Sequence, residues 1–253
     1  MKKTVIKMSI FLLTISLGYS QGVINSEKLF NSEVEKFYFI LSPTIDIQSG
    51  NSEVFETGLQ FSSLYKITNR NWLKGTAGVD IIREEGEDVS NDKFLQLRHT
   101  FSIKKWIHTF TFYQLQNSFS LGVKKRELLG SGLRLKLLKK EDVALDIGVG
   151  VMIESEEYNS DIPISEKNRM TSMMIFKRNI NSIELKNTTY YQPYIINIWD
   201  FRLLNELDLT FSINDWLDYE VNYIIRYDNE QPSFLDKKLD QYITSGFNIK
   251  FTK

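Results

Sequence analysis

The chain has 253 residues, and its 31 Lys and Arg residues nearly balance its 32 Asp and Glu residues, for a net charge of -1. This balance argues against the strongly basic surface of a nucleic-acid-binding protein, so we expect no nucleic-acid partner. The absence of Cys excludes disulfides, Cys-based zinc sites and a thiol nucleophile. With only two His residues, a multi-His metal centre is not expected. The composition therefore predicts neither a metal nor a cofactor.

The first residues have the pattern of a secretory signal peptide. Three lysines accompany an apolar run over residues 8–17, and the small residues Gly18 and Ser20 follow it. The apolar run is too short to cross a bilayer as a helix, which argues against the alternative of a membrane anchor. We predict a signal peptide over residues 1–20 and a short periplasmic segment over residues 21–34.

Beyond residue 34, apolar residues recur at every second position. In the segment Val143–Glu154 the odd positions are Val, Leu, Ile, Val, Val and Ile, whereas the even positions are Ala, Asp, Gly, Gly, Met and Glu. Successive side chains of a strand point to opposite faces, so this segment predicts a strand with one apolar face and one small or polar face. The same pattern predicts about twelve strands, at residues 35–48, 53–67, 72–83, 93–104, 106–116, 126–138, 143–155, 168–178, 183–193, 199–213, 217–227 and 238–251.

The length and charge of these strands favour a membrane barrel over a soluble sandwich. Most of them reach ten residues, about the length that a tilted strand needs to cross an outer membrane. Where the two faces are clear, the central positions of the apolar face carry no Asp, Glu, Lys or Arg. Short joins alternate with mostly longer joins, as in outer-membrane barrels. We therefore predict an all-β fold, a single antiparallel up-and-down transmembrane β-barrel over residues 35–253, located in the cell outer membrane among its lipids.

Tryptophans and the last strand support this prediction. Trp72, Trp106 and Trp216 each follow a short turn, where they would form an aromatic girdle at one membrane interface, and Trp199 would join the opposite girdle. Residues 244–251 resemble the carboxy-terminal strand signal that the barrel-assembly machinery reads, although Thr and Lys follow the final aromatic residue. We expect that machinery to be a partner, and the barrel to be a monomer.

Four segments together resemble an outer-membrane family known as domain of unknown function number four-eighty-one, some of whose members are described as salt-stress-induced. The segments are Phe94–His99, Glu127–Arg134, Asn187–Pro193 and Arg202–Leu207. The resemblance covers most of the chain beyond the signal peptide. It implies a monomeric outer-membrane β-barrel, and it supplies no catalytic residues.

Charged residues gather on the face opposite the apolar one, which would line the barrel interior. Unpaired charges in a narrow lumen are costly, so we expect these side chains to pair with one another. The predicted lumen charge network comprises Arg98, Arg134, Arg202, Arg226, Glu206, Asp208, Glu220 and Asp240. Such a network is compatible either with a salt-bridged plug or with a narrow channel for a small polar solute.

The two histidines are the candidates for an alternative function, a lipid-acting outer-membrane hydrolase. That chemistry needs a Ser or Thr hydroxyl within hydrogen-bond reach of His99 or His108. No Ser or Thr accompanies His99 two residues away on its own face, where Leu97 and Phe101 lie. We interpret both histidines as interface residues and expect no catalytic residues and no enzyme activity.

Three other motifs are better explained by structure than by function. The stretch Gly130-Ser131-Gly132 lies within a predicted strand without a following helix, so it does not predict a phosphate loop. The glycosylation sequence Asn187-Thr188-Thr189 also lies in a strand. The acidic stretch Glu84–Asp88 lacks the ligand spacing of a calcium site, and we interpret it as a solvated loop.

The sequence thus predicts a non-enzymatic outer-membrane barrel that serves as a narrow small-solute channel or as a structural barrel of the envelope under osmotic stress. A hydrolase and a module that binds ligands with its outer loops are the alternatives.

Overall fold

The computed structural model describes Asn25, Glu27 and residues 36–48, 54–84, 87–119, 121–159, 162–231 and 237–252. The predicted signal peptide over residues 1–20 lies outside the described residues. In the described part of the chain, no helix has the length and hydropathy needed to cross a membrane.

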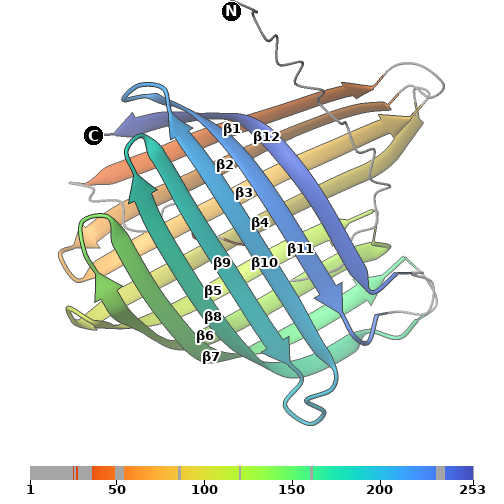
Figure 1. The fold of residues 1–253 in the computed structure, drawn as a ribbon. Coiled ribbons are helices and arrows are strands. Elements are labelled where there is room, and N and C mark those ends of the chain that lie inside the picture. Colours follow the sequence, from red (N-terminus) through yellow and green to blue (C-terminus); the bar gives the residue numbers. More distant parts are fainter. Residues whose placement is uncertain are drawn as a thin grey trace, which may run out of the picture.

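The described chain forms twelve strands that close into one barrel, as the sequence predicts (Figure 1). Every strand pairs in antiparallel fashion with its neighbour in sequence, and β1 pairs with β12 to complete the ring. The strands are β1 Phe37–Gln48, β2 Val54–Thr68, β3 Asn71–Glu84, β4 Glu87–Lys104, β5 Ile107–Ser118, β6 Val123–Lys139, β7 Val143–Tyr158, β8 Ser165–Ile180, β9 Ile183–Pro193, β10 Phe201–Ser212, β11 Leu217–Asp228 and β12 Leu239–Thr252.

The alternation of side chains separates an apolar outside from a polar inside. On β7, the side chains of Val149, Val151 and Ile153 are 54–58% exposed, whereas Met152 and Glu154 are 2% and 1% exposed. A water-soluble protein rarely exposes a contiguous apolar surface of this kind, whereas a barrel wall that faces lipid requires it. The predicted assignment of faces on this strand is confirmed.

The closing seam between β1 and β12 is short. Paired residues run from Tyr38↔Thr252 to Leu41↔Ile249. Pro43 follows two residues later and has no N–H group to donate to the ladder. Further along the seam, the side chain of Ser42 donates a 2.5 Å hydrogen bond to Asn248. The seam therefore combines a short backbone ladder with a side-chain bond inside the barrel.

The joins at the end that holds the last residues of β12 are short, for example the turns at residues 69–70, 105–106 and 181–182. At the opposite end of the barrel, one join between strands differs from its prediction. The expected loop over 84–92 is mostly strand, since β3 extends to Glu84 and β4 already begins at Glu87. Asp92 helps to hold this extension, because it accepts a 2.7 Å hydrogen bond from Ser118 and a 2.9 Å bond from the backbone N–H of Phe119.

An apolar cluster fills part of the barrel interior, on the inner faces of β5 to β10. Two inner-wall glycines make room for its aromatic rings, since a Cβ on Gly130 would lie 2.5 Å from the ring of Phe112, and one on Gly132 would lie 2.7 Å from that of Phe110. The buried members of the cluster are Phe110, Phe112, Leu128, Ala144, Met152, Met173, Ile175, Tyr190 and Leu204.

Candidate functional site

The interior contains a group of three cationic side chains around one carboxylate. We call Glu27, Lys74, Arg98 and Arg134 the Glu27 cluster. Glu27 is completely buried, and its carboxylate accepts a 2.9 Å bond from Lys74, a 3.0 Å bond from Arg134 and a bond from Arg98. Glu27 is not part of any strand, so a residue that precedes the barrel contributes the central anion of this cluster.

A second residue from the same segment also lies inside the wall. The Nδ2 of Asn25 donates a 2.7 Å hydrogen bond to the carboxylate of Glu206 on β10. Asn25 and Glu27 fall within residues 21–34, which the sequence analysis assigns to a periplasmic segment. Nothing in the sequence pattern around them predicts a place in the lumen.

A larger ionic group lies on the inner faces of β6, β7, β8 and β10. We call Arg126, Arg169, Arg202, Glu154 and Glu156 the Glu154 cluster. Glu154 accepts bonds from all three guanidinium groups, at 3.0 Å from the Nε of Arg126 and 2.6 Å from the Nε of Arg169. Glu156 accepts a 3.0 Å hydrogen bond from Arg202 and forms an ion pair with Arg126, whose Nε lies 3.0 Å from it. Buried charges need such compensation, and here each cation has at least one carboxylate partner.

Two carboxylates at the rim extend the Glu154 cluster. Asp228 accepts a 2.8 Å bond from Arg202. Asp200, in the join before β10, accepts bonds of 2.9 Å from Arg169 and 2.6 Å from Lys167. Burial alone would raise the pKa of Asp200, but the hydrogen bond from Lys167 and the charge of Arg169 hold this pKa below its usual value. The rim is therefore held in its ionised, paired form.

The residues of the predicted lumen charge network belong to several separate groups in the structure. Arg98 and Arg134 belong to the Glu27 cluster, and Arg202 belongs to the Glu154 cluster. Asp208 pairs with Lys186 at 2.8 Å, and Glu220 accepts a 2.8 Å bond from Asn248. The structure thus places these residues inside the barrel but not in a single network.

The remaining two network residues lie opposite each other. Arg226 and Asp240 are cross-strand partners on β11 and β12. The guanidinium of Arg226 also lies over the ring of Tyr242, 5.1 Å from its centroid. Such a placement adds a cation–π attraction to the interior wall.

Six of the nine members of the two ionic clusters are absent from the predicted lumen charge network. Glu27 lies outside the alternating region. Arg126 and Arg169 lie near the first residues of β6 and β8, where the predicted strands began too late or had no clear apolar face. Glu154 and Glu156, in contrast, share the parity of Asp146 on β7, so extending the alternation would have found them.

One strip of the interior is open to solvent rather than packed. We call Thr44, Glu56, Gln60, Asp80, Thr244 and Gly246, from β12, β1, β2 and β3, the open strip. Asp80 is exposed although it lies on the inner face, and the other members are partly exposed. Towards the short turns the same strands bury their inner residues, including Ser62, Leu64 and Lys74. The interior is thus solvent-exposed along this strip and filled at the level of Glu27, and beyond the strip Ile82 and Asp240 are buried again.

The aromatic girdle differs from prediction at one position. Trp106, Trp199 and Trp216 are 52–73% exposed at the ends of the barrel. Trp72 instead points inward, where it packs beside Ile40 and Leu64. Side chains two residues apart on a strand point to the same face, so Trp72 shares the inner face of β3 with the buried Lys74.

The two histidines occupy different environments. His99 lies on the outer face, 3.2 Å from the side-chain oxygen of Asn71. His108 is buried inside, with its ring 5.9 Å from that of Trp72, so its interpretation as an interface residue is wrong. Among the described residues, neither ring is hydrogen-bonded to a Ser or Thr hydroxyl. The contacts required for a nucleophile and its base are thus not formed in the part of the chain that the structure describes.

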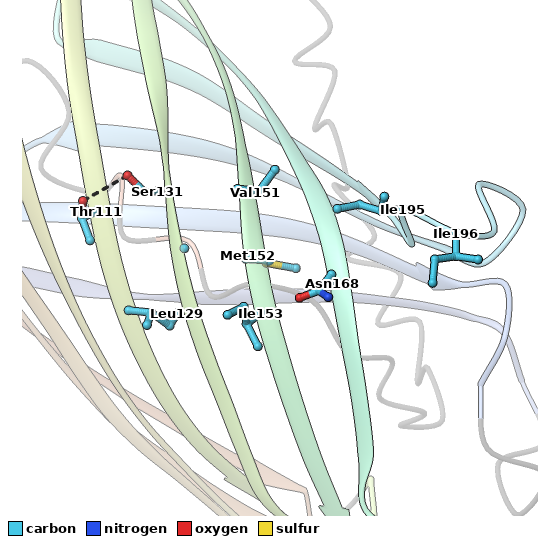
Figure 2. Close-up of a pocket in the computed structure, with 10 residues that line it drawn as sticks. Thr111, Leu129, Ser131, Val151, Met152, Ile153, Asn168, Ile195 and Ile196 are labelled. Carbon is cyan, nitrogen blue, oxygen red and sulfur yellow. Dashed lines mark hydrogen bonds between the residues drawn. The ribbon is translucent and has the colours of Figure 1, made fainter.

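The outer wall carries a groove of about 570 Å³. Its sides are apolar, with Leu129, Val151 and Ile153 on the strands and Ile195 and Ile196 in the join before β10 (Figure 2). The hydroxyls in its floor are satisfied, because Thr111 lies 3.2 Å from Ser131, which donates to the carbonyl of Phe110. The groove therefore offers a surface suited to hydrocarbon chains, without a group placed for chemistry.

The glycosylation sequence lies on the same outer wall. The side chain of Asn187 is hydrogen-bonded to Asn205 at 3.2 Å and accepts a 3.3 Å bond from Thr189. Its amide is thus occupied within the sheet. Within the described ranges, no group of three or more His, Asp or Glu side chains could hold a metal ion.

Comparison with known proteins identifies the family. The model of the family "Protein of unknown function, DUF481" matches residues 44–251. The chain belongs to the DUF481 family. A search of the curated proteins gave no match for this DUF481 chain.

Solved structures share the fold of this DUF481 chain at low sequence identity. The NanC porin matches with a TM-score of 0.51 and 12% identity, over 85% of this chain and 99% of that one. The translocator domain of the autotransporter NalP from Neisseria meningitidis matches with a TM-score of 0.52 and 8% identity, over 90% of this chain and 92% of that one. At these identities the likeness shows the fold alone, that of an outer-membrane β-barrel.

Proposed function

We propose that this protein is a narrow channel for small polar solutes in the cell outer membrane. The observation that carries the proposal is the open strip, where the carboxylate of Asp80 is solvent-exposed on the inner face of a barrel whose outside is apolar. A charge that lines a water-filled passage is hydrated there, whereas a fully packed interior would bury it.

The two ionic clusters and the apolar cluster make the passage narrow. They occupy the inner faces of β3 to β10, so the space that remains lies along the open strip. Twelve strands enclose more room than an eight-strand barrel that side chains fill, and less than a porin of sixteen strands. The space that remains inside the barrel fits a solute of a few non-hydrogen atoms better than it fits an oligomer.

Single-channel recording in planar lipid bilayers tests the proposal. The variant Asp80→Asn removes one charge from the open strip, and we expect it to shift the ratio of cation to anion permeability by about twofold towards anions. The matched control is Glu127→Gln, because Glu127 lies on the outer face beside Tyr113 and should not affect the current. A barrel that passes no current either as wild type or as Glu27→Ala would contradict the channel, and an unchanged permeability ratio in Asp80→Asn would show that the open strip does not line it.

The Glu154 cluster favours a second candidate, a structural barrel of the envelope that resists osmotic load. Three buried guanidinium groups and their carboxylates tie four strands, β6, β7, β8 and β10, together across the interior. If the barrel conducts no ions in any variant, and its loss makes cells sensitive to osmotic shock, this second function replaces the first.

A further inference from the structure

We propose that Lys74, Arg98 and Arg134 form a binding site for the carboxylate of a small solute, which Glu27 occupies in the resting barrel. This inference deepens the proposed channel function by naming the solute class, and it rests on that function for its role in the cell. The binding site itself requires only the geometry of the interior.

The three cations belong to the wall, whereas the anion does not. Lys74, Arg98 and Arg134 lie on β3, β4 and β6, and Glu27 lies outside every strand. Lys74 and Arg98 are direct cross-strand partners, a like-charge pair that destabilises a sheet unless an anion lies between them. The wall thus supplies the three positive charges, and a residue outside the sheet supplies the anion.

Arg98 is held in position by contacts other than its ion pair. Its guanidinium lies 5.4 Å from the ring centroid of Phe110 and 5.5 Å from that of Phe112. Its Nε has no hydrogen-bond partner among the described residues, so the guanidinium retains a donor for an incoming oxygen. A planar guanidinium held in this way matches a carboxylate, which accepts two parallel hydrogen bonds.

Neighbouring charges leave the site positive when Glu27 is absent. Asp146 pairs with Arg134 at 2.8 Å and offsets one of the three cations. Glu206 is the other acid linked to the segment, through its 2.7 Å bond from Asn25. Lys136 follows Arg134 on the inner face of β6 and adds a further positive charge. Among the described residues, Glu27 is the carboxylate that contacts all three cations.

The occupant can be replaced without breaking the sheet. Glu27 contributes to no strand pairing, so its departure costs the ion pairs but leaves the backbone ladder intact. A small solute carboxylate in the place of Glu27 would restore ion pairs with the three cations. The group of Glu27 that contacts the three cations is a carboxylate. A carboxylate is therefore the kind of ligand that these cations fit.

Chemical rescue of Glu27→Ala tests the proposal in the otherwise intact barrel. Thermal unfolding in detergent micelles is followed by circular dichroism in sodium chloride and in sodium acetate of equal ionic strength. We expect Glu27→Ala to lower the midpoint in chloride, and acetate to raise the midpoint of this variant by about 2–4 °C. Acetate should leave wild type unchanged, because Glu27 already fills the site.

Two further variants identify the site. Glu157→Ala removes an exposed carboxylate that pairs with Lys124 at 2.5 Å, and acetate should not affect its midpoint. Adding Lys74→Met to Glu27→Ala should abolish the response to acetate, and Arg98→Lys serves as the second partner variant if the first does not fold. The proposal is overturned if acetate stabilises wild type as much as Glu27→Ala, or stabilises neither.

The same variants separate this inference from the channel function. If Glu27→Ala binds acetate but no variant passes current, the carboxylate site stands and the channel does not. If the barrel conducts and acetate neither stabilises Glu27→Ala nor reduces its current, the channel stands and the carboxylate site is refuted.

Discussion

The Nζ of Lys74 donates a 2.9 Å hydrogen bond to Glu27, which joins the third strand of the barrel to a residue outside every strand. Both side chains are buried, so water cannot replace either partner when the other is lost. This bond links the filling of the lumen to the stability of its wall. The effects of substituting the two residues on the free energy of unfolding should therefore not be additive.

We expect a double-mutant cycle of Glu27→Ala and Lys74→Ala to give a coupling free energy of about 2 kcal/mol, the range for a hydrogen bond between charged groups. The measurement is the free energy of unfolding in urea, with the barrel in detergent micelles. The exposed pair Lys124 and Glu157 is the matched control, and its cycle should give less than about 1 kcal/mol. Strictly additive effects of Glu27→Ala and Lys74→Ala would show that the bond does not form.

Glu154 should be more important for stability than any other carboxylate of its cluster. It is 1% exposed and accepts bonds from three guanidinium groups, so Glu154→Gln leaves three buried cations with one acceptor charge fewer. We expect a loss of about 3–5 kcal/mol in the free energy of unfolding, as when one partner of a buried ion pair is removed. Glu157→Gln, on the neighbouring exposed position, should cost less than about 1 kcal/mol. Similar costs for the two variants would contradict a buried network.

The pairing of two strands depends on glycine at one close approach. A Cβ on Gly132 would lie 2.3 Å from the carbonyl oxygen of Val149 and 2.7 Å from the Cα of Gly150. Gly132→Ala must therefore shift the backbone of β6 or β7, and we expect it to cost about 1–3 kcal/mol in unfolding experiments. For the control Gly75→Ala, the nearest atom is the Oγ of Ser63 at 3.1 Å, so a small rotation accommodates the methyl group. Equal stability of the two variants would show that β6 and β7 are not this close.

The stability of the rim should decrease in acid through Asp200. The pKa of Asp200 is lower in the folded barrel than in the unfolded chain, so its contribution to stability is present above the unfolded pKa of about 4 and is lost as the pH falls through the folded pKa. We expect the unfolding midpoint of wild type to fall more steeply between pH 5 and pH 2.5 than that of Asp200→Asn. The difference between the two curves isolates this group from other carboxylates. Parallel curves would indicate that Asp200 is not paired with Lys167 and Arg169.

The barrel could be predicted because its sequence repeats one physical rule, the alternation of lipid-facing and inward-facing side chains. The same rule places Trp72 inside, beside Lys74, and its position after a turn misled the prediction of a girdle. His108 was harder to place because β5 carries Phe110 and Phe112 on its inner face and Thr109 and Thr111 on its outer face, so both faces mix polar and apolar residues.

The centre of the candidate site could not be predicted in this way. Glu27 lies where no alternation exists, and its partners come from strands 47, 71 and 107 residues away in sequence. Their approach depends on the stagger of the closed barrel, which sequence periodicity does not determine. The pattern could therefore supply the cations but not the anion that joins them.

A charge on the outer wall distinguishes a barrel in lipid from a barrel in water. Val151 lies near the middle of β7 with its side chain 56% exposed on the outer face. In a lipid bilayer, Val151→Lys should cost about 2–4 kcal/mol in the free energy of unfolding into urea, because the ammonium group must leave water. At an exposed position in water, the same change would cost less than about 0.5 kcal/mol.

The control for this last prediction is Ile164→Lys, at an exposed residue in the join before β8 that no strand carries into the membrane. Refolding both variants into vesicles and titrating them with urea measures the two costs under one condition. A destabilised Val151→Lys beside an unaffected Ile164→Lys is the expected pair of results, because only the first position lies at the depth of the hydrocarbon. If both variants unfold at the wild-type urea concentration, the apolar outer face is not in contact with lipid, and the outer-membrane location would have to be abandoned.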